Sequence, residues 1–284
     1  MRNVLSLLRE AMAKNDSLAC CGLDPDLAKI PAEIAKKRRS DEAKVLAFLR
    51  EVIDLTGTHV CAYKVQKAFF DVFPRGHALL ADTIGYAQEN YPNVPVFVDA
   101  KIGDIDNTMT AYLHNIFEEL GADGVVLNPY MGDDVIAPME EYADKAGIVL
   151  AKTSNAGGGV IQDALLSDGT PFWRYVLGLT VNRWNRAGNL IPVLSSTADI
   201  DFDGIRQELP DTMPILFAGF GAQGGSLKHF RQLLDSSRRG VFVNSSRGLL
   251  YPYETSDKDW RQKIDAATVS LKETLNTERK RHGE

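Results

Sequence analysis

The sequence predicts an α/β fold, a (β/α)8 TIM barrel formed by a single domain over residues 1–284. Eight short apolar runs recur along the chain, and each one ends in polar or glycine-rich sequence. Most of these runs are nearly continuous, which is typical of parallel strands buried on both faces. Amphipathic segments separate them, and this alternation of strand and helix is the pattern of a (β/α)8 barrel. A doubly wound open sheet is the alternative, and the lack of a linker favours one domain.

The predicted strands follow the apolar runs in chain order. Each run is short and bounded by loop sequence, and the longest connections follow the first and the fifth of them. The runs occupy residues 18–24, 59–65, 94–101, 124–130, 147–155, 189–196, 214–221 and 240–246.

The predicted helices lie at the two ends of the chain and between the strands. Residues 1–17 have a helical period, so the domain is expected to begin with an N-terminal helix. Ser40 is placed to cap another helix, whose first turn is acidic and whose apolar residues share one face. Gly121 is the expected stop of the helix that precedes it. The remaining predicted helices span residues 107–120, 170–187 and, at the C-terminus, 256–279.

The composition excludes several classes of protein. The 32 basic and 38 acidic residues give a formal net charge of −6, so neither a nucleic-acid nor a membrane surface is expected. Three cysteines without a Cys-x-x-Cys spacing indicate reduced thiols and a cytoplasmic protein. The N-terminus does not read as a signal peptide, and no apolar run approaches the ~18 residues that a membrane helix needs.

Polar residues follow the predicted strands, where a barrel carries its functional loops. Asp24 follows the first strand, and Lys64 ends the second. The third strand ends in Asp99, Lys101 and Asp104. The later strands add Asn128, Lys152, Ser154, Asn155 and Arg247. These side chains are therefore expected to gather at one rim of the barrel.

The third strand and its loop, VFVDAKIGDIDNT at residues 96–108, raise the question of how charges survive at the end of a buried strand. Asp99 and Lys101 are two residues apart, so in an extended strand they point to the same side. Lys64 reaches the same space from the neighbouring strand, and Asp104 lies on the following turn. Interleaved lysines and aspartates keep one another ionised. A purely structural buried network is the alternative interpretation.

A phosphate site is predicted beside this cluster. GFGAQGG, residues 219–225, leaves backbone N–H groups uncovered, and Gln223 adds a donor. Arg247 adds a fixed cation at the end of the next strand, and barrels commonly hold phosphate at these two loops. Glycines that merely form tight turns are the alternative.

No metal site and no cofactor are predicted. The five histidines are scattered, without a His-x-His or His-Glu-x-x-His spacing. Magnesium on Asp99 and Asp104 is conceivable, but Lys101 between them would compete for the carboxylates. No Ser-His-Asp arrangement is visible.

The run DAKIGDIDNT, residues 99–108, resembles the Asp-x-Lys-x-x-Asp-Ile-x-x-Thr signature of the orotidine 5′-monophosphate decarboxylase family. The similarity extends along nearly the whole chain, and it is most like the longer bacterial subgroup. Related barrel decarboxylases and aldolases carry a similar Asp-x-Lys-x-x-Asp, so the signature is specific only together with the other motifs. These are CGLDP (21–25), YKVQKAFFD (63–71), LNPYMG (127–132), KTSNAGGG (152–159), GFGAQGG (219–225) and NSSRGLLYP (244–252).

The resemblance implies a decarboxylase that converts orotidine 5′-monophosphate (OMP) to UMP without a cofactor. Lys101 would protonate C6 of the pyrimidine, and Asp99 would face the departing carboxylate. Asp104, Ile105 and Thr108 would enter the site of the partner subunit of a homodimer. The other implied roles are ribose binding by Lys64 and Asp24, pyrimidine binding by Ser154 with Asn155 beside it, and phosphate binding by Gln223 and Arg247.

Two departures from the family pattern concern loops rather than charged groups. Ala218 stands where proline is expected, and PVLSST at residues 192–197 replaces a Gly-Ala-Thr type of strand end. The alternative functions are a magnesium-dependent sugar-phosphate decarboxylase or aldolase of the same suprafamily, and a non-catalytic nucleotide-binding barrel. A non-catalytic nucleotide-binding barrel is disfavoured, because placing the Asp99 carboxylate against an anionic ligand would not help such a protein to bind it.

Overall fold

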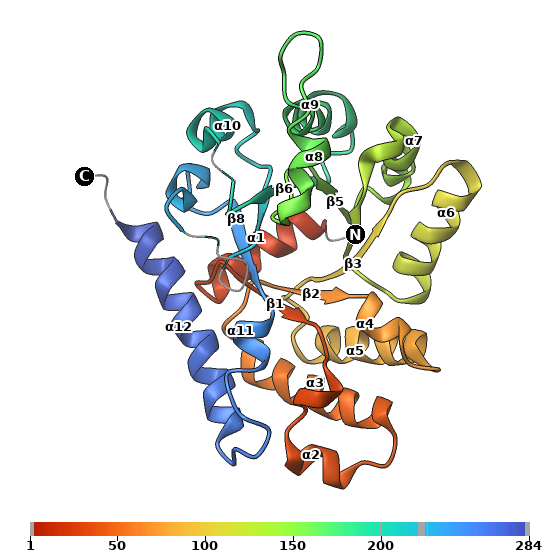
Figure 1. The fold of residues 1–284 in the computed structure, drawn as a ribbon, viewed down its shortest axis with the longest axis vertical. Helices are drawn as coiled ribbons and strands as arrows, with labels where there is room; N and C mark the ends of the chain where they lie inside the picture. Colours follow the sequence, from red (N-terminus) through yellow and green to blue (C-terminus); the bar gives the residue numbers. More distant parts are fainter. Residues whose placement is uncertain (1–2, 199, 221–224, 226, 282–284) are drawn as a thin grey trace.

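The chain folds into a closed parallel barrel surrounded by helices (Figure 1). The computed structural model describes residues 3–198, 200–220, 225 and 227–281. In this part of the chain the strands follow one another around the barrel in sequence order, and β8 pairs with β1 to close it. The predicted (β/α)8 barrel is confirmed, and the open sheet is wrong. The strands are β1 (Ala19–Leu23), β2 (Ala62–Gln66), β3 (Val96–Ile102), β4 (Gly124–Leu127), β5 (Ala146–Leu150), β6 (Leu190–Ser195), β7 (Ile215–Ala218) and β8 (Val241–Ser245).

Helices cover the outside of the barrel and fill its connections. The long helices are α1 (Val4–Lys14), α3 (Asp41–Thr56), α5 (Gly76–Asn90), α6 (Asp106–His114), α9 (Phe172–Leu179) and α12 (Trp260–Lys280). Shorter ones are α2 (Ala32–Lys37), α4 (Ala68–Asp71), α7 (Asp133–Ile136), α8 (Gly159–Gln162), α10 (Phe202–Glu208) and α11 (Arg247–Leu250). Figure 1 shows them arranged around the strands, with α12 along one flank.

Each predicted strand overlaps an observed one, but the observed strands are shorter. The predicted run 147–155 gives a strand that ends at Leu150, and the run 59–65 gives one that begins at Ala62. The apolar runs extend past the paired backbone because residues next to a strand are also buried, as at Val60 and Ala151. The apolar runs therefore mark which residues are buried, and the hydrogen-bonded pairing of the strands ends before the buried stretch does.

The predicted helix signals are confirmed in detail. The Ser40 hydroxyl accepts a hydrogen bond from the Ala43 N–H at 3.2 Å and caps α3. The helix predicted over 107–120 is α6 followed by a π-helical turn over Asn115–Glu119, and Gly121 ends it with a φ of +68°. The helix predicted over 170–187 likewise divides into α9 and a π-helical turn, Thr180–Trp184.

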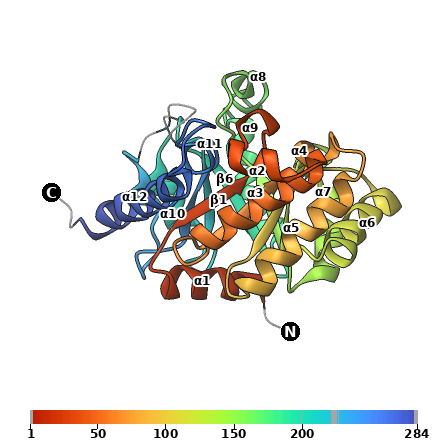
Figure 2. The same cartoon turned by 90° about the horizontal axis from the view of Figure 1, so that it is seen from below.

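Helix α1 covers the N-terminal end of the barrel. Its apolar face buries Leu5, Leu8 and Met12. Its first residue donates a backbone hydrogen bond to the Asp144 carbonyl oxygen at 3.0 Å. Figure 2 shows α1 below the barrel and α8 at the opposite end. The C-terminal ends of the strands are therefore left for the functional site.

Aromatic side chains fill the barrel interior beneath that end. Phe97 on β3 and Phe242 on β8 are fully buried, with ring centroids 5.9 Å apart. These two strands are not neighbours in the sheet, so the contact crosses the interior. Asp99 and Asn244 stand two residues further along the same strands, on the same faces. The aromatic pair is thus an apolar floor under the polar residues above it.

We expect Asn189→Ala to lower the free energy of unfolding by about 2–3 kcal/mol. The buried Asn189 amide donates to the carbonyl oxygens of Met139, Tyr142 and Lys145 at 3.2, 3.0 and 3.0 Å, and alanine removes all three of these hydrogen bonds. Urea denaturation measures the change. Asn90→Ala, which removes an exposed bond to the Tyr86 carbonyl, is the matched control and should change stability by less than about 0.5 kcal/mol. Equal effects from both variants would contradict this role of Asn189.

Candidate functional site

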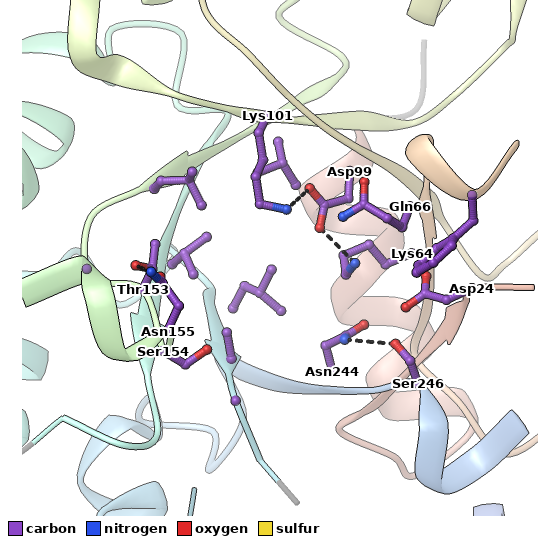
Figure 3. Close-up of a pocket in the computed structure, with 18 of the residues that line it drawn as sticks. Asp24, Lys64, Gln66, Asp99, Lys101, Thr153, Ser154, Asn155, Asn244 and Ser246 are labelled. Atoms are coloured by element: carbon purple, nitrogen blue, oxygen red, sulfur yellow. Dashed lines mark hydrogen bonds and ion pairs between the residues drawn. The ribbon is translucent and has the colours of Figure 1, made fainter. Parts of the chain in front are cut away.

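A cavity of about 1400 Å³ opens at the C-terminal ends of the strands. Most of the residues predicted from the sequence line it together, although they come from six different strands and their loops, and several of them are drawn in Figure 3. The predicted residues in its wall are Asp24, Lys64, Asp99, Lys101, Asn128, Ser154, Asn155 and Arg247. Gln223 lies outside the described residues.

The centre of the cavity holds a carboxylate between two ammonium groups. Lys64 Nζ lies 2.8 Å from Asp99 Oδ2, and Lys101 Nζ lies 2.6 Å from Asp99 Oδ1. Each oxygen of Asp99 thus carries one cation (Figure 3). Asp99 is 6% exposed and Lys64 is 7% exposed, whereas the Lys101 side chain is 47% exposed and reaches into the open part of the cavity. Both ammonium groups line the cavity, and Lys101 is the more open of the two to a bound molecule.

The pairing decides the protonation of the buried groups. Burial alone would raise the pKa of Asp99, but the ammonium groups of Lys64 and Lys101 outweigh burial and hold that pKa below its ordinary value. Burial alone would lower the pKa of Lys64, but the carboxylates of Asp99 and Asp24 outweigh it and raise that pKa. The network therefore stays charged at neutral pH.

The backbone at Lys101 departs from the regular strand on which the prediction was based. Its φ is +45°, in the left-handed region that side chains other than glycine rarely adopt. The pairing of β3 with β4 shifts register between Val98 and Ile102. The ammonium group of Lys101 still meets Asp99 as predicted, but a bulge rather than simple alternation brings it there.

The turn after β3 is fixed by close packing. A Cβ atom on Gly103 would lie 2.3 Å from the carbonyl oxygen of Asn128, so only glycine fits at this position. The turn then directs Asp104 away from the charged centre, where its carboxylate accepts a hydrogen bond from the Ile105 N–H at 2.9 Å. Within the described residues, no ion pair joins Asp104 to Lys64 or Lys101.

The structure does not bring Asp104, Ile105 and Thr108 to the cavity of their own chain. Among the described residues that line the cavity, none of the three is present. Ile105 is 40% exposed and Thr108 is exposed on α6. This placement leaves them on the outer surface beside the cavity.

Asp24 has an unused acceptor at the cavity wall. Its Oδ1 is buried and has no hydrogen-bond partner among the described residues. The loop that holds it is tied down by Tyr251, whose hydroxyl accepts from the Asp26 N–H at 2.7 Å and donates to the Asp24 carbonyl oxygen at 3.0 Å. A buried carboxylate oxygen without a donor favours a ligand that brings hydroxyl groups.

Gln66 is a polar residue of the wall that was missed by the sequence analysis, whereas Asn244 belongs to the polar end of the eighth predicted strand, which was expected at this rim. Gln66 stands two residues after Lys64, and Asn244 two residues after Phe242, so strand alternation carries both into the cavity. Asn244 Nδ2 lies 3.5 Å from the Ser246 hydroxyl (Figure 3). The alternation was available in the sequence, but it was applied only to the charged residues.

Strand β8 delivers Arg247 to the rim through a tight contact. A Cβ atom on Gly22 would lie 1.9 Å from the Ser246 hydroxyl oxygen, so the glycine of β1 lets the turn after β8 approach. Arg247, the next residue, is exposed at the start of α11 and lines the cavity. Of the predicted glycine loop, Gly219, Phe220 and Gly225 are described, and a bridge pairs Phe220 with Gly225.

The described residues carry neither a metal-binding cluster nor a membrane-spanning helix. No group of three or more His, Cys, Asp or Glu side chains in the described ranges is placed to hold a metal ion. In the same part of the chain, no helix has both the length and the apolar character that crossing a membrane requires.

The fold and the site define a (β/α)8-barrel protein with a paired lysine–aspartate centre at the ends of its strands. The model of the orotidine 5′-phosphate decarboxylase / HUMPS family matches residues 20–249. A protein of Bordetella avium (strain 197N) named orotidine 5′-phosphate decarboxylase is 35% identical over 98% of this chain and 100% of its own length. The chain belongs to the orotidine 5′-phosphate decarboxylase / HUMPS family.

Solved structures agree with this assignment. The structure of Leishmania donovani OMP decarboxylase has a TM-score of 0.81 and 31% identity, over 99% of this chain and 100% of that one. The structure of Leishmania donovani UMP synthase has a TM-score of 0.83 and 32% identity over 98% of this chain. This chain spans 57% of the length of that UMP synthase.

The lowered pKa of Asp99 predicts a pH-dependent contribution to stability. A carboxyl whose folded pKa lies below its ordinary value of 3.8 stabilises the fold above that pH and loses the contribution as the pH falls through the folded pKa. We therefore expect Asp99→Asn to be destabilising at pH 6.5, and we expect its difference from wild type to shrink as the pH is lowered below 3.8. Urea denaturation over this pH range measures the difference, which would not shrink if the fold did not lower the pKa of Asp99.

Proposed function

We propose that this protein decarboxylates OMP to UMP and CO2 in pyrimidine biosynthesis, without a cofactor. The observation that carries the proposal is the buried carboxylate of Asp99 between the ammonium groups of Lys64 and Lys101. The family membership and the names of the relatives supply the substrate class.

The chemistry demands a fixed cation beside the reacting carbon. When the bond from C6 to the carboxylate breaks, its electron pair stays on C6 in an in-plane orbital, with no ring system to delocalise it. Lys101 stabilises that charge and then transfers its proton to C6, which completes UMP and leaves the lysine neutral until solvent reprotonates it. Asp99 holds the ammonium in place before the reaction, so little reorganisation is needed.

The remaining walls of the cavity suit the rest of the nucleotide. Asp24, with its unpaired Oδ1, and Lys64 bind the ribose hydroxyls. Ser154 and Asn155 bind the pyrimidine from the side of the cavity opposite Asp24 (Figure 3). Arg247 at the rim binds the phosphate together with Gln223.

A homodimer completes the site in this proposal. Apolar side chains are exposed on the segments after β2, β3 and β4, beside the cavity, and they suit a contact with a second copy. Asp104, Ile105 and Thr108 lie on the same face and would enter the cavity of the partner, where Asp104 joins the lysines. The exposed apolar residues on these three segments are Phe69, Val72, Ile105, Tyr112, Tyr130 and Met131.

The alternative of a magnesium-dependent sugar-phosphate enzyme is less well supported. Magnesium binds carboxylate oxygens, and both oxygens of Asp99 are already occupied by ammonium groups. The curated relatives over nearly the full chain are named decarboxylases of orotidine 5′-phosphate.

We expect purified protein to consume OMP, followed by its absorbance, equally with and without EDTA. Lys101→Ala should abolish turnover while UMP still binds, because the ammonium acts on the reacting carbon and the phosphate contacts remain. Lys37→Ala, which removes an exposed lysine paired with Glu33, is the control and should keep full activity. Decarboxylation retained by Lys101→Ala would refute the proposed mechanism.

Mixing two inactive variants tests the shared site. Lys101→Ala and Asp104→Ala each disable a different subunit's contribution, so a heterodimer regains one intact site. We expect activity to return, up to about one quarter of the wild-type value, after unfolding and refolding of an equal mixture. If subunit exchange is confirmed and activity stays absent, Asp104 acts within its own chain.

A further inference from the structure

The loop between β5 and α9 carries Ser154 and is closed at its base by a set of polar contacts. One side of the base is Lys152 and Thr153, directly after β5. The other side is Gln162 and Asp163, at the end of α8. We call these four residues the clasp. The contacting pairs are separated by 11 residues (Lys152 and Asp163) and 9 residues (Thr153 and Gln162) along the chain, and they hold both ends of the segment that contains Ser154.

Three contacts join the two sides of the clasp. Lys152 Nζ lies 2.5 Å from Asp163 Oδ1. The Thr153 N–H donates to Gln162 Oε1 at 3.0 Å, and Gln162 Nε2 donates to the Thr153 hydroxyl at 2.7 Å. The same hydroxyl donates to Asn155 Oδ1 at 2.7 Å. The residues on both sides of Ser154 are therefore held by side-chain hydrogen bonds.

The clasp is anchored in the barrel rather than at the tip of the loop. Lys152 is 8% exposed, and its backbone N–H donates to the Val193 carbonyl oxygen of β6 at 3.0 Å. Val160, on α8, is 85% exposed. The buried lysine also needs its partner, because an unpaired ammonium in this position is costly. The base of the loop is thus the part whose geometry the barrel fixes.

Lys152 and Asp163 are separated from the main cavity by the segment that they hold. Both line a second cavity of about 420 Å³ behind the loop, and among the described residues neither lines the main one. Ser154 lines both cavities. The ion pair therefore cannot touch a nucleotide in the main cavity, but it holds the residue that does.

We propose that Lys152 and Asp163 are positioning residues for pyrimidine recognition, which act by fixing Ser154 at the wall of the main cavity. The inference rests on the proposed function, since Ser154 is there the pyrimidine ligand. In this inference, binding of the base by Ser154 depends on an ion pair that does not itself contact the substrate. Removal of the pair should weaken binding of the base and leave binding of the ribose phosphate unchanged.

The test compares two ligands that differ in the base. Isothermal titration gives the affinity of each variant for UMP and for ribose 5-phosphate, which lacks the pyrimidine. We expect Asp163→Ala to weaken UMP binding by about tenfold, the worth of one well-placed hydrogen bond, and to change ribose 5-phosphate binding less than about twofold. Unchanged ribose 5-phosphate binding also reports an intact fold. Asp163→Glu, which keeps the carboxylate, should restore most of the UMP affinity.

A double-mutant cycle shows whether the pair acts through Ser154. In a Ser154→Ala background, Asp163→Ala should cause no further loss of UMP affinity, because the residue that it positions is already absent. Val160→Ala, a change at an exposed residue of α8 in the same segment, is the control and should leave both affinities as in wild type.

The outcomes separate this inference from the proposed function. Wild-type protein that binds UMP and turns over OMP, together with an Asp163→Ala variant that keeps its preference for UMP over ribose 5-phosphate, would overturn the inference alone. Additive losses in the cycle would overturn it as well. Wild-type protein that neither binds UMP nor consumes OMP would overturn the proposed function, and the inference with it.

Discussion

The structure depends on one interaction, the carboxylate of Asp99 held between the ammonium groups of Lys64 and Lys101. A buried carboxylate is tolerated only when its charge is compensated, and removing one partner from such a group is far more costly than the net worth of the pair. The closed barrel makes the compensation possible because neighbouring strands end at one rim, so β2 and β3 present their charges to each other. The aromatic floor of Phe97 and Phe242 keeps the low-dielectric interior directly beneath.

Strain accompanies this arrangement at Lys101. A positive φ costs a residue with a side chain of order 1 kcal/mol or more, and such strain persists only where surrounding structure imposes it. Here the register shift between β3 and β4 and the close approach of Gly103 to the Asn128 carbonyl impose it. The result is a half-exposed ammonium tethered to a buried anion, which is a suitable geometry for a proton donor to a bound molecule.

The sequence predicted the parts of the molecule that follow from local rules. Eight apolar runs located the strands, and Ser40 and Gly121 located helix ends, because capping and burial are short-range effects. The barrel rule then gathered Lys64 and Asp99 at one rim. The bulge at Lys101 was not predicted because it depends on how two strands pair. The clasp was not predicted because its ion pair connects a strand end to a separate helix. Asp104 was expected beside the lysines from its place on the turn after β3, but the turn carries it away from the cavity of its own chain, because its direction depends on how Gly103 packs against the Asn128 carbonyl.

The charged centre and the clasp divide the proposed reaction between opposite walls of one cavity. Both lysines are already paired with Asp99 in the ligand-free chain, so in the proposed reaction an anionic substrate carboxylate enters a site that holds another carboxylate, and the two repel each other. When the substrate carboxylate leaves as neutral CO2, its repulsion from Asp99 is relieved. At the same moment, negative charge appears on C6 beside Lys101. Such a design works only if the base is held in register from the other side, since a shift of about 1 Å in the reacting atoms can cost about a hundredfold in rate. In the proposed reaction a rigid wall at Ser154 is therefore as necessary as the cation, and the proposed role of the buried Lys152 is to supply it.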